Sequence, residues 1–116
     1  MKRVIYDNKP SAIEAVGNGS YLYRWQIEQI VSEEFTHWSC YQVIISNTPT
    51  QESITEKVIE AIWGGGVEQK LINDYQASLL GVIDQSYTEP YMEFLAERKA
   101  LKETIAEDVE RWKSAL

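Results

Sequence analysis

The side chains best suited to chemistry in this sequence are a single histidine, His37, and a single cysteine, Cys40. The chain has no second histidine, and a zinc site would lack its usual thiolate partners. Cys40 belongs to a strand face that we expect to be buried, whereas a reactive thiol needs an exposed, electropositive setting. We therefore expect no catalytic residue, no metal site and no cofactor, and the chain is not predicted to be an enzyme.

The triple glycine Gly64-Gly65-Gly66 precedes a predicted helix and could in principle cradle a phosphate at the helix N-terminus. The residues that follow, 67–70, are Val-Glu-Gln-Lys and lack the Gly-Lys-Ser/Thr of a phosphate-binding loop. Glu68 would also place a negative charge in the first helical turn. A hinge or a helix stop is the favoured interpretation of these glycines.

These residues must be positioned by elements that the sequence also predicts, beginning with a β-rich part at residues 1–47. Residues 2–6 and 12–16 form short strand-like runs separated by turn formers. The segment Gly17-Asn18-Gly19-Ser20 then contains an Asn-Gly step, which tolerates the positive φ angles of a tight hairpin. We expect a hairpin at that point.

The strongest strand signal comes next, because apolar and polar residues alternate from residue 21 to residue 28. A second strand is predicted from about Thr36 to Ser46. A turn centred on Glu33-Glu34 would join the two strands. Residues 21–46 are therefore predicted to form an antiparallel hairpin that is the nucleus of the sheet.

The predicted register places Trp25 opposite Gln42, so that Trp25 and Trp38 share one face of the hairpin. Aromatic side chains on a sheet face can stack sugars or bases, but at this spacing they more often form the core. A binding module would leave Trp25 or Trp38 exposed in a concave groove, whereas a structural protein would bury both. The aromatic set comprises Tyr21, Tyr23, Trp25, Trp38 and Tyr41.

The second part of the chain, residues 53–116, is predicted to contain about three helices. Ser53 and Glu56 fit a capping box that starts the first helix, and the glycines at 64–66 end it. A second helix is predicted from Val67 to Leu80, with the first two helices forming a helical hairpin. The inward-facing residues of the second helix are predicted to be Leu71, Ile72, Tyr75 and Leu79.

A third, long helix is predicted from Pro90 to the last residue, because proline suits a first helical turn and a periodic stretch follows. A helix of about 25 residues is longer than a compact domain of this size needs. Val109 and Trp112 are therefore candidate interaction residues left for another chain, and docking of the whole stripe within its own chain stays open as the alternative. The stripe comprises Phe94, Leu95, Leu101, Ile105, Val109 and Trp112.

Length and charge limit the partners of this chain. It has 116 residues, the usual size of one domain, and a net charge of −7, of which −6 falls in residues 51–116. Phosphate backbones and anionic lipids attract clustered Lys and Arg, so we expect neither nucleic acid nor a membrane as a partner. With no apolar run near 20 residues and no signal-peptide core at residues 1–8, the expected location is cytoplasmic.

Three stretches of the sequence are informative together: residues 11–25 (SAIEAVGNGSYLYRW), 54–56 (ITE) and 68–75 (EQKLINDY). They resemble small proteins of uncharacterised function encoded in prophages of Bacteroides-type gut bacteria, and the likeness continues into residues 91–101. The resemblance implies a setting near phage tail and structural genes, with a virion as an alternative location, and implies no catalytic residue.

The predicted strands and helices indicate a single-domain α+β protein with an N-terminal antiparallel sheet and a C-terminal helical segment. The expected function is that of a phage-related structural, assembly or accessory protein acting through protein contacts, with itself or with a phage structural protein. The alternative is a small-ligand or carbohydrate-binding module that uses the aromatic face of residues 21–46. In either case the candidate interaction residues are Trp25, Trp38, Val109 and Trp112.

Overall fold

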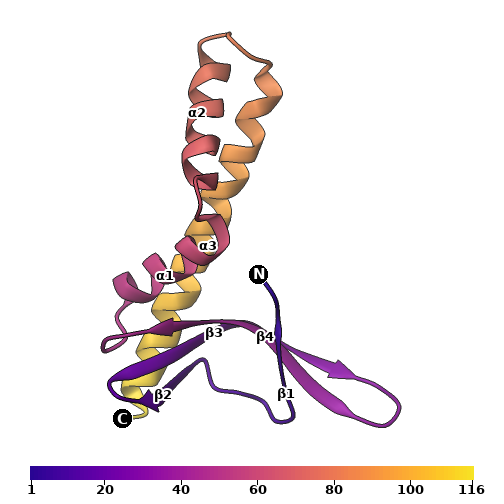
Figure 1. The fold of residues 1–116 in the computed structure, drawn as a ribbon, viewed down its shortest axis with the longest axis vertical. Coiled ribbons are helices and arrows are strands. Elements are labelled where there is room, and N and C mark those ends of the chain that lie inside the picture. The colour runs from indigo at the N-terminus through magenta and orange to yellow at the C-terminus, as the bar shows by residue number, and fades with distance from the viewer.

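A computed structural model describes residues 1–116 and shows the predicted α+β fold, with a four-stranded antiparallel sheet followed by three helices (Figure 1). The sheet order is β1-β4-β3-β2. The elements are β1 (Val4–Tyr6), β2 (Ile13–Gly17), β3 (Ser20–Val31), β4 (Thr36–Ile45), α1 (Gln51–Trp63), α2 (Val67–Leu79), the short 3₁₀ helix η1 (Gln85–Tyr87) and α3 (Thr88–Ser114).

The turn between β2 and β3 forms where the Asn-Gly step predicts it. Asn18 and Gly19 both have positive φ, 55° and 72°, and Gly17 pairs with Ser20 across the turn. A positive φ at both central residues matches the right-handed twist of the two strands. The predicted hairpin is confirmed.

The β3–β4 hairpin is also present, but a β-bulge changes its register. Trp25 pairs with Tyr41 and Glu28 pairs with Ser39, so Gln26 and Ile27 together face a single residue. Gln26 has a φ of 50°, which is unusual for a residue other than glycine. The extra residue shifts every pair on the core side of the bulge by one position.

The predicted register is therefore correct near the loop, where Val31 pairs with Thr36, and wrong beyond the bulge. Trp25 lies opposite Tyr41, which is three residues from Trp38 on β4. Because side chains alternate between the faces of a strand, Trp25 and Trp38 lie on opposite faces of the sheet. The prediction that they share one face is wrong, and Gln26 carries no sequence signal that would have revealed the bulge.

The helix boundaries agree with the prediction, whereas the cap of α1 does not. Thr50 is the N-cap, and it forms a capping box with Ser53, which had been the expected cap. Gly64 ends α1 and Gly66, with a φ of 90°, precedes α2. The glycines thus act as a helix stop and a connection, as predicted.

The packing of the helices differs from the predicted helical hairpin of the first two. Both α1 and α2 pack on α3, one after the other along its length, and α1 also contacts β4 (Figure 1). Of the residues expected to face inward on α2, Leu79 is exposed, while Ser78 is the one fully buried residue of that helix. The partner of α2 is therefore the first half of α3.

The core lies between the sheet and the C-terminal half of α3, with α1 closing one side. Its buried members come from β2, β3, β4, α1 and α3. Burial of these side chains is the main stabilising contribution to a domain of this size. They are Ile13, Tyr23, Trp25, Ile45, Ile54, Val58, Ile105 and Val109.

Two arms project from this core and give the chain an extended shape (Figure 1). The helical arm consists of α2, η1 and the first turns of α3, and the hairpin arm consists of the loop end of β3 and β4. The radius of gyration is 17.3 Å, against about 13 Å for a compact chain of this length. The molecule measures 51 × 39 × 23 Å, so much of its surface belongs to the arms.

Candidate interaction surfaces

The free end of the helical arm exposes an uninterrupted apolar segment. From the last residue of α2 into the connection to η1, the chain reads Leu79-Leu80-Gly81-Val82-Ile83. The exposed fractions of Leu79, Leu80 and Val82 are 59%, 79% and 74%. We call these three residues the apolar tip. Consecutive apolar side chains held in solvent mark an interaction site more often than single exposed ones do.

Hydrogen bonds hold the apolar tip in a defined conformation. Gly81 has a φ of 75°, and the Val82 amide donates to the Ala77 carbonyl at 3.0 Å, which closes the end of α2. The buried Ser78 hydroxyl donates to the Asp84 carbonyl at 3.0 Å and so joins α2 to the loop. The tip side chains therefore point outward from an ordered backbone.

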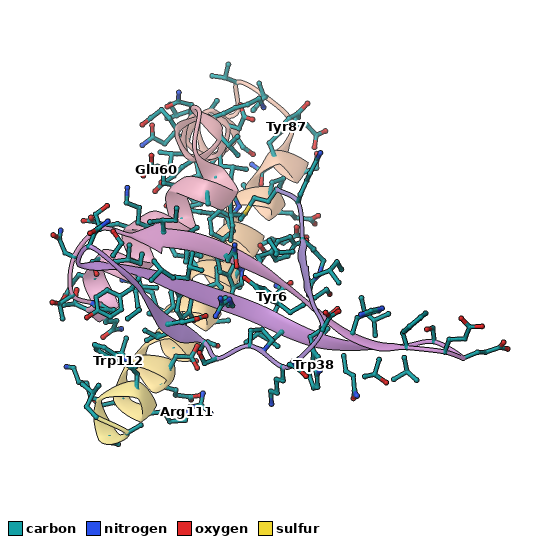
Figure 2. All side chains as sticks on the ribbon, turned by 60° about the horizontal axis from the view of Figure 1, so that its bottom comes forward. Tyr6, Trp38, Glu60, Tyr87, Arg111 and Trp112 are labelled. Carbon is teal, nitrogen blue, oxygen red and sulfur yellow. The ribbon has the colours of Figure 1, made fainter.

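The start of η1 is fixed by Asp84, directly after the tip. Its side chain accepts a hydrogen bond of 2.8 Å from the Ser86 backbone N–H, and this bond lowers the pKa of the Asp84 carboxyl. Tyr87, which Figure 2 labels, and Met92 add further exposed apolar surface to the helical arm. The arm thus combines an ordered end with exposed apolar side chains.

The helical arm is acidic. Residues 67–95 contain five carboxylates and one basic residue, Lys70. The Lys70 ammonium lies 2.7 Å from Asp74 and is paired within α2. A partner that contacts this arm therefore meets an apolar tip carried by a segment with a net negative charge.

The hairpin arm is a second exposed surface. Val31 and Phe35, at its loop end, are 73% and 59% exposed. The Ser32 amide donates to the Phe35 carbonyl at 2.9 Å, which closes the loop, and the Phe35 ring stacks on His37 with ring centres 5.6 Å apart. The outer edge of β3 has no paired strand beyond Arg24 (Figure 1), and such edges can pair with another chain.

An aromatic cleft of about 630 Å³ lies between the sheet and the helices α1 and α3. Trp25 lines it but is only 3% exposed, since its ring packs against Tyr23 and Tyr41. A ring buried to this extent offers little surface for stacking a sugar. The other lining residues are Met1, Gln26, Tyr41, Ile62, Trp63, Glu97, Ala100, Leu101 and Thr104.

Trp38 lies on the opposite sheet face, half-buried at the base of the hairpin arm (Figure 2). The Lys9 ammonium lies 5.5 Å from the centre of its ring, and Tyr6 is its neighbour on β1. The ring therefore has contacts within its own chain on two sides.

The same face of the sheet holds a buried arginine, Arg24, which is 3% exposed. Its guanidinium lies 2.6 Å from the Glu14 carboxylate, donates to the Ser11 carbonyl at 3.0 Å and covers the Tyr6 ring at 4.7 Å. These contacts satisfy the charge inside the fold, so the arginine has a structural role.

Cys40 and His37, the two residues with potential chemistry, both lie on β4, three residues apart. Cys40 is fully buried, as predicted, and its burial raises the pKa of the thiol, which makes it a poor nucleophile. The His37 ring nitrogen Nδ1 lies 3.5 Å from the Asp7 carboxylate. No group of three or more His, Cys, Asp or Glu side chains could hold a metal ion.

The last turns of α3 contact the sheet of their own chain. Val109 is 4% exposed, and the Trp112 ring meets the Tyr21 ring edge-on with centres 5.7 Å apart. The Tyr23 hydroxyl also donates to Asp108 at 2.6 Å. Val109 and Trp112 therefore pack within their own chain, which is the alternative that the sequence left open. The long helix overruns the core at its N-terminal end, because the sheet lies against its C-terminal half.

Reasoning from periodicity missed the apolar tip, because it assigned Leu79 to the inward stripe of α2 and gave no role to the connection that follows. The signal that could have found the tip is the run Leu79-Leu80-Gly81-Val82-Ile83 itself. A connection between two helices is normally polar, so an apolar run that continues from a helix end into the connection makes this surface a candidate for contacts with a partner.

Comparisons with protein-family models, curated proteins and solved structures find no match to this chain. None of its helices combines the length and the apolar character needed to cross a bilayer.

Proposed function

We propose that this protein acts through protein contacts made by its two arms, as a structural, assembly or accessory protein without catalytic activity. The observation that carries the proposal is that both arms end in exposed apolar residues, represented by Val82 on the helical arm and Val31 on the hairpin arm. Ordered apolar side chains at the ends of projections are costly in water, and a partner that covers them recovers that free energy.

The distribution of buried residues supports the same proposal. Only 16 of the 116 residues are buried, and eight of them form the core between the sheet, α1 and the C-terminal half of α3. The arms contribute little to this core, because each projects away from it (Figure 1). Elements that add little to the stability of the fold are well suited to contacts with other molecules.

The sequence resemblance supports a prophage as the biological setting of this function. In a prophage context the partner is a phage structural protein or a second copy of this chain, and the location is the cytoplasm or the virion. The net charge of −7 favours a protein partner over nucleic acid or an anionic membrane.

Site-specific photo-crosslinking in the native host tests the proposal. A photoreactive amino acid is placed at Val82, at Val31 or, as a control, at Glu103, which lies on an exposed part of α3 away from both arms. We expect a discrete crosslinked protein from at least one arm position and none from the control. Equal labelling from all three positions, or none from any, contradicts the proposal.

The aromatic cleft favours one alternative, a small-ligand-binding module. A volume of about 630 Å³ falls within the range of ligand pockets, and seven of its ten lining residues are hydrophobic. The burial of Trp25 disfavours a carbohydrate, so an apolar ligand is the better candidate. Saturable quenching of tryptophan fluorescence by a small apolar molecule, abolished by Leu101→Trp, which would fill the cleft, favours this alternative over the arm-based function.

A further inference from the structure

We propose that the apolar tip of the helical arm binds an apolar pocket bordered by lysine or arginine side chains on a different protein. The inference rests on the proposed function and specifies the chemistry of the partner. It combines three observations: the exposure of Leu79, Leu80 and Val82, the fixed backbone beneath them, and the charge of the arm that carries them.

The fixed backbone makes the tip suitable for docking into a preformed pocket. The bond from Val82 N–H to the Ala77 carbonyl and the bond from Ser78 to the Asp84 carbonyl hold both ends of the segment. A segment that is ordered before binding loses less conformational entropy when it docks. Projecting side chains on such a segment are the usual form of an anchor that fills a pocket in a partner.

The charge of the helical arm determines what surrounds that pocket. Five carboxylates against the single, internally paired Lys70 leave residues 67–95 with a net charge of −4. Basic side chains around the pocket would complement this charge, speed the encounter and exclude acidic competitors. An anionic membrane surface lacks such groups and repels the arm.

The same charge argues against a second copy of the chain as the occupant. Each copy carries a net charge of −7, and four of its eleven basic residues, Arg3, Arg24, Lys70 and Arg111, are already in ion pairs within their own chain. The loop end of the hairpin arm is acidic as well, with Glu33 and Glu34. Two copies would therefore bring like charges together at either arm.

The test uses fluorescence anisotropy with two labelled amphipathic helical peptides, one built from leucine and lysine and the other from leucine and glutamate. The full-length protein is compared with Val82→Asp and with the matched control Val31→Asp. The two valines are 74% and 73% exposed, so the same change is made at equally exposed positions on the two arms. Vesicles of phosphatidylcholine and sedimentation velocity complete the set of measurements.

We expect the leucine–lysine peptide to bind, Val82→Asp to weaken binding at least tenfold, and Val31→Asp to leave it unchanged. Added salt should weaken binding further, and the leucine–glutamate peptide should not bind. The substitution at Val82 adds a negative charge, which by itself would strengthen attraction to a basic peptide. A loss of affinity therefore identifies the apolar contact as the cause.

Three outcomes would overturn the inference: binding of both peptides with equal affinity, tip-dependent binding to the vesicles, or self-association that Val82→Asp abolishes. Binding that Val31→Asp abolishes and Val82→Asp does not would refute the role of the tip, while the arm-based function stands. Failure of both peptides to bind refutes the inference; if photo-crosslinking also yields no product from either arm, the proposed function fails with it.

Discussion

Replacing Tyr23 with phenylalanine should destabilise the fold by removing one hydrogen bond between the sheet and α3. The Tyr23 side chain is fully buried, and its hydroxyl donates to the Asp108 carboxylate at 2.6 Å. Asp108 also accepts a hydrogen bond of 2.7 Å from Arg111. Phenylalanine keeps the ring and its packing, so the change isolates the hydroxyl contact.

The expected loss follows from the partners of this bond. A hydrogen bond to a charged group contributes about 1.5–3 kcal/mol to stability. Because Asp108 is largely covered but keeps its pairing with Arg111, the loss should lie near the lower end, at about 1.5–2 kcal/mol. For a chain of this length, such a loss lowers the melting temperature by roughly 5–10 °C.

Urea unfolding followed by circular dichroism measures this loss, with unchanged m-values confirming that the unfolding transition is the same. A double-mutant cycle with Asp108→Ala then isolates the coupling between the two side chains, which should exceed about 1 kcal/mol. A loss below about 0.5 kcal/mol for Tyr23→Phe, or a coupling near zero, would show that the contact does not hold α3 to the sheet.

Three further predictions concern the sheet and its contacts with α3. Burial, together with the bond to Asp108, raises the pKa of Tyr23 above its usual value near 10, so the folded chain retains a proton that the unfolded chain loses. In a Cys40→Ala background, which removes the raised pKa of the thiol, Tyr23 should lower the free energy of unfolding by up to about 1.4 kcal/mol per pH unit above about pH 10. Adding Tyr23→Phe to this background should flatten the slope. Val109→Ala should cost about 1–3 kcal/mol in urea unfolding without changing the sedimentation coefficient, and an altered oligomer with unaltered stability would place Val109 at an interface. Gln26→Gly should leave stability unchanged or raise it by up to about 1 kcal/mol, because glycine adopts a φ of 50° without strain; a loss of 1 kcal/mol or more would show that the bulge depends on the Gln26 side chain.

Local signals in the sequence predict the elements of this fold well. The Asn18-Gly19 step predicts the β2–β3 turn, and the triple glycine at 64–66 predicts the break between α1 and α2. Both signals act through backbone conformations that few residue types adopt. They therefore depend little on the rest of the chain.

The arrangement of those elements depends on features with weak sequence signals. One positive φ at Gln26 moves Trp25 to the face opposite Trp38, and no glycine marks that position. An apolar stripe on α3 identifies Phe94, Ile105 and Val109 as buried but does not show where along the helix the sheet lies. Val109 and Trp112 were consequently predicted to be left for another chain, with docking inside their own chain as the alternative, whereas the half of α3 that extends beyond the sheet is the N-terminal one, which packs with α2.

The sequence predicts the class of partner but not the place of the interaction surface. Composition and charge predict an acidic protein that binds neither nucleic acid nor metal, and a protein contact remains the favoured proposal. Periodicity is uninformative for the connection at residues 80–84, because a loop of five residues has no repeating face, and it placed Leu79 on the inward side of α2, where the structure shows it exposed. Its apolar character becomes informative once the fold shows that this loop ends a projecting arm.

Methyl-resolved NMR of the chain bound to the protein recovered by crosslinking tests the role of the arms most directly. We predict that the largest shift changes on binding fall on the methyl groups of Leu79, Leu80 and Val82, with Val31 showing whether the hairpin arm takes part. The methyl groups of Leu101, in the aromatic cleft, should remain unchanged. Shift changes confined to Leu101 and its neighbours, with the tip unaffected, would contradict the account.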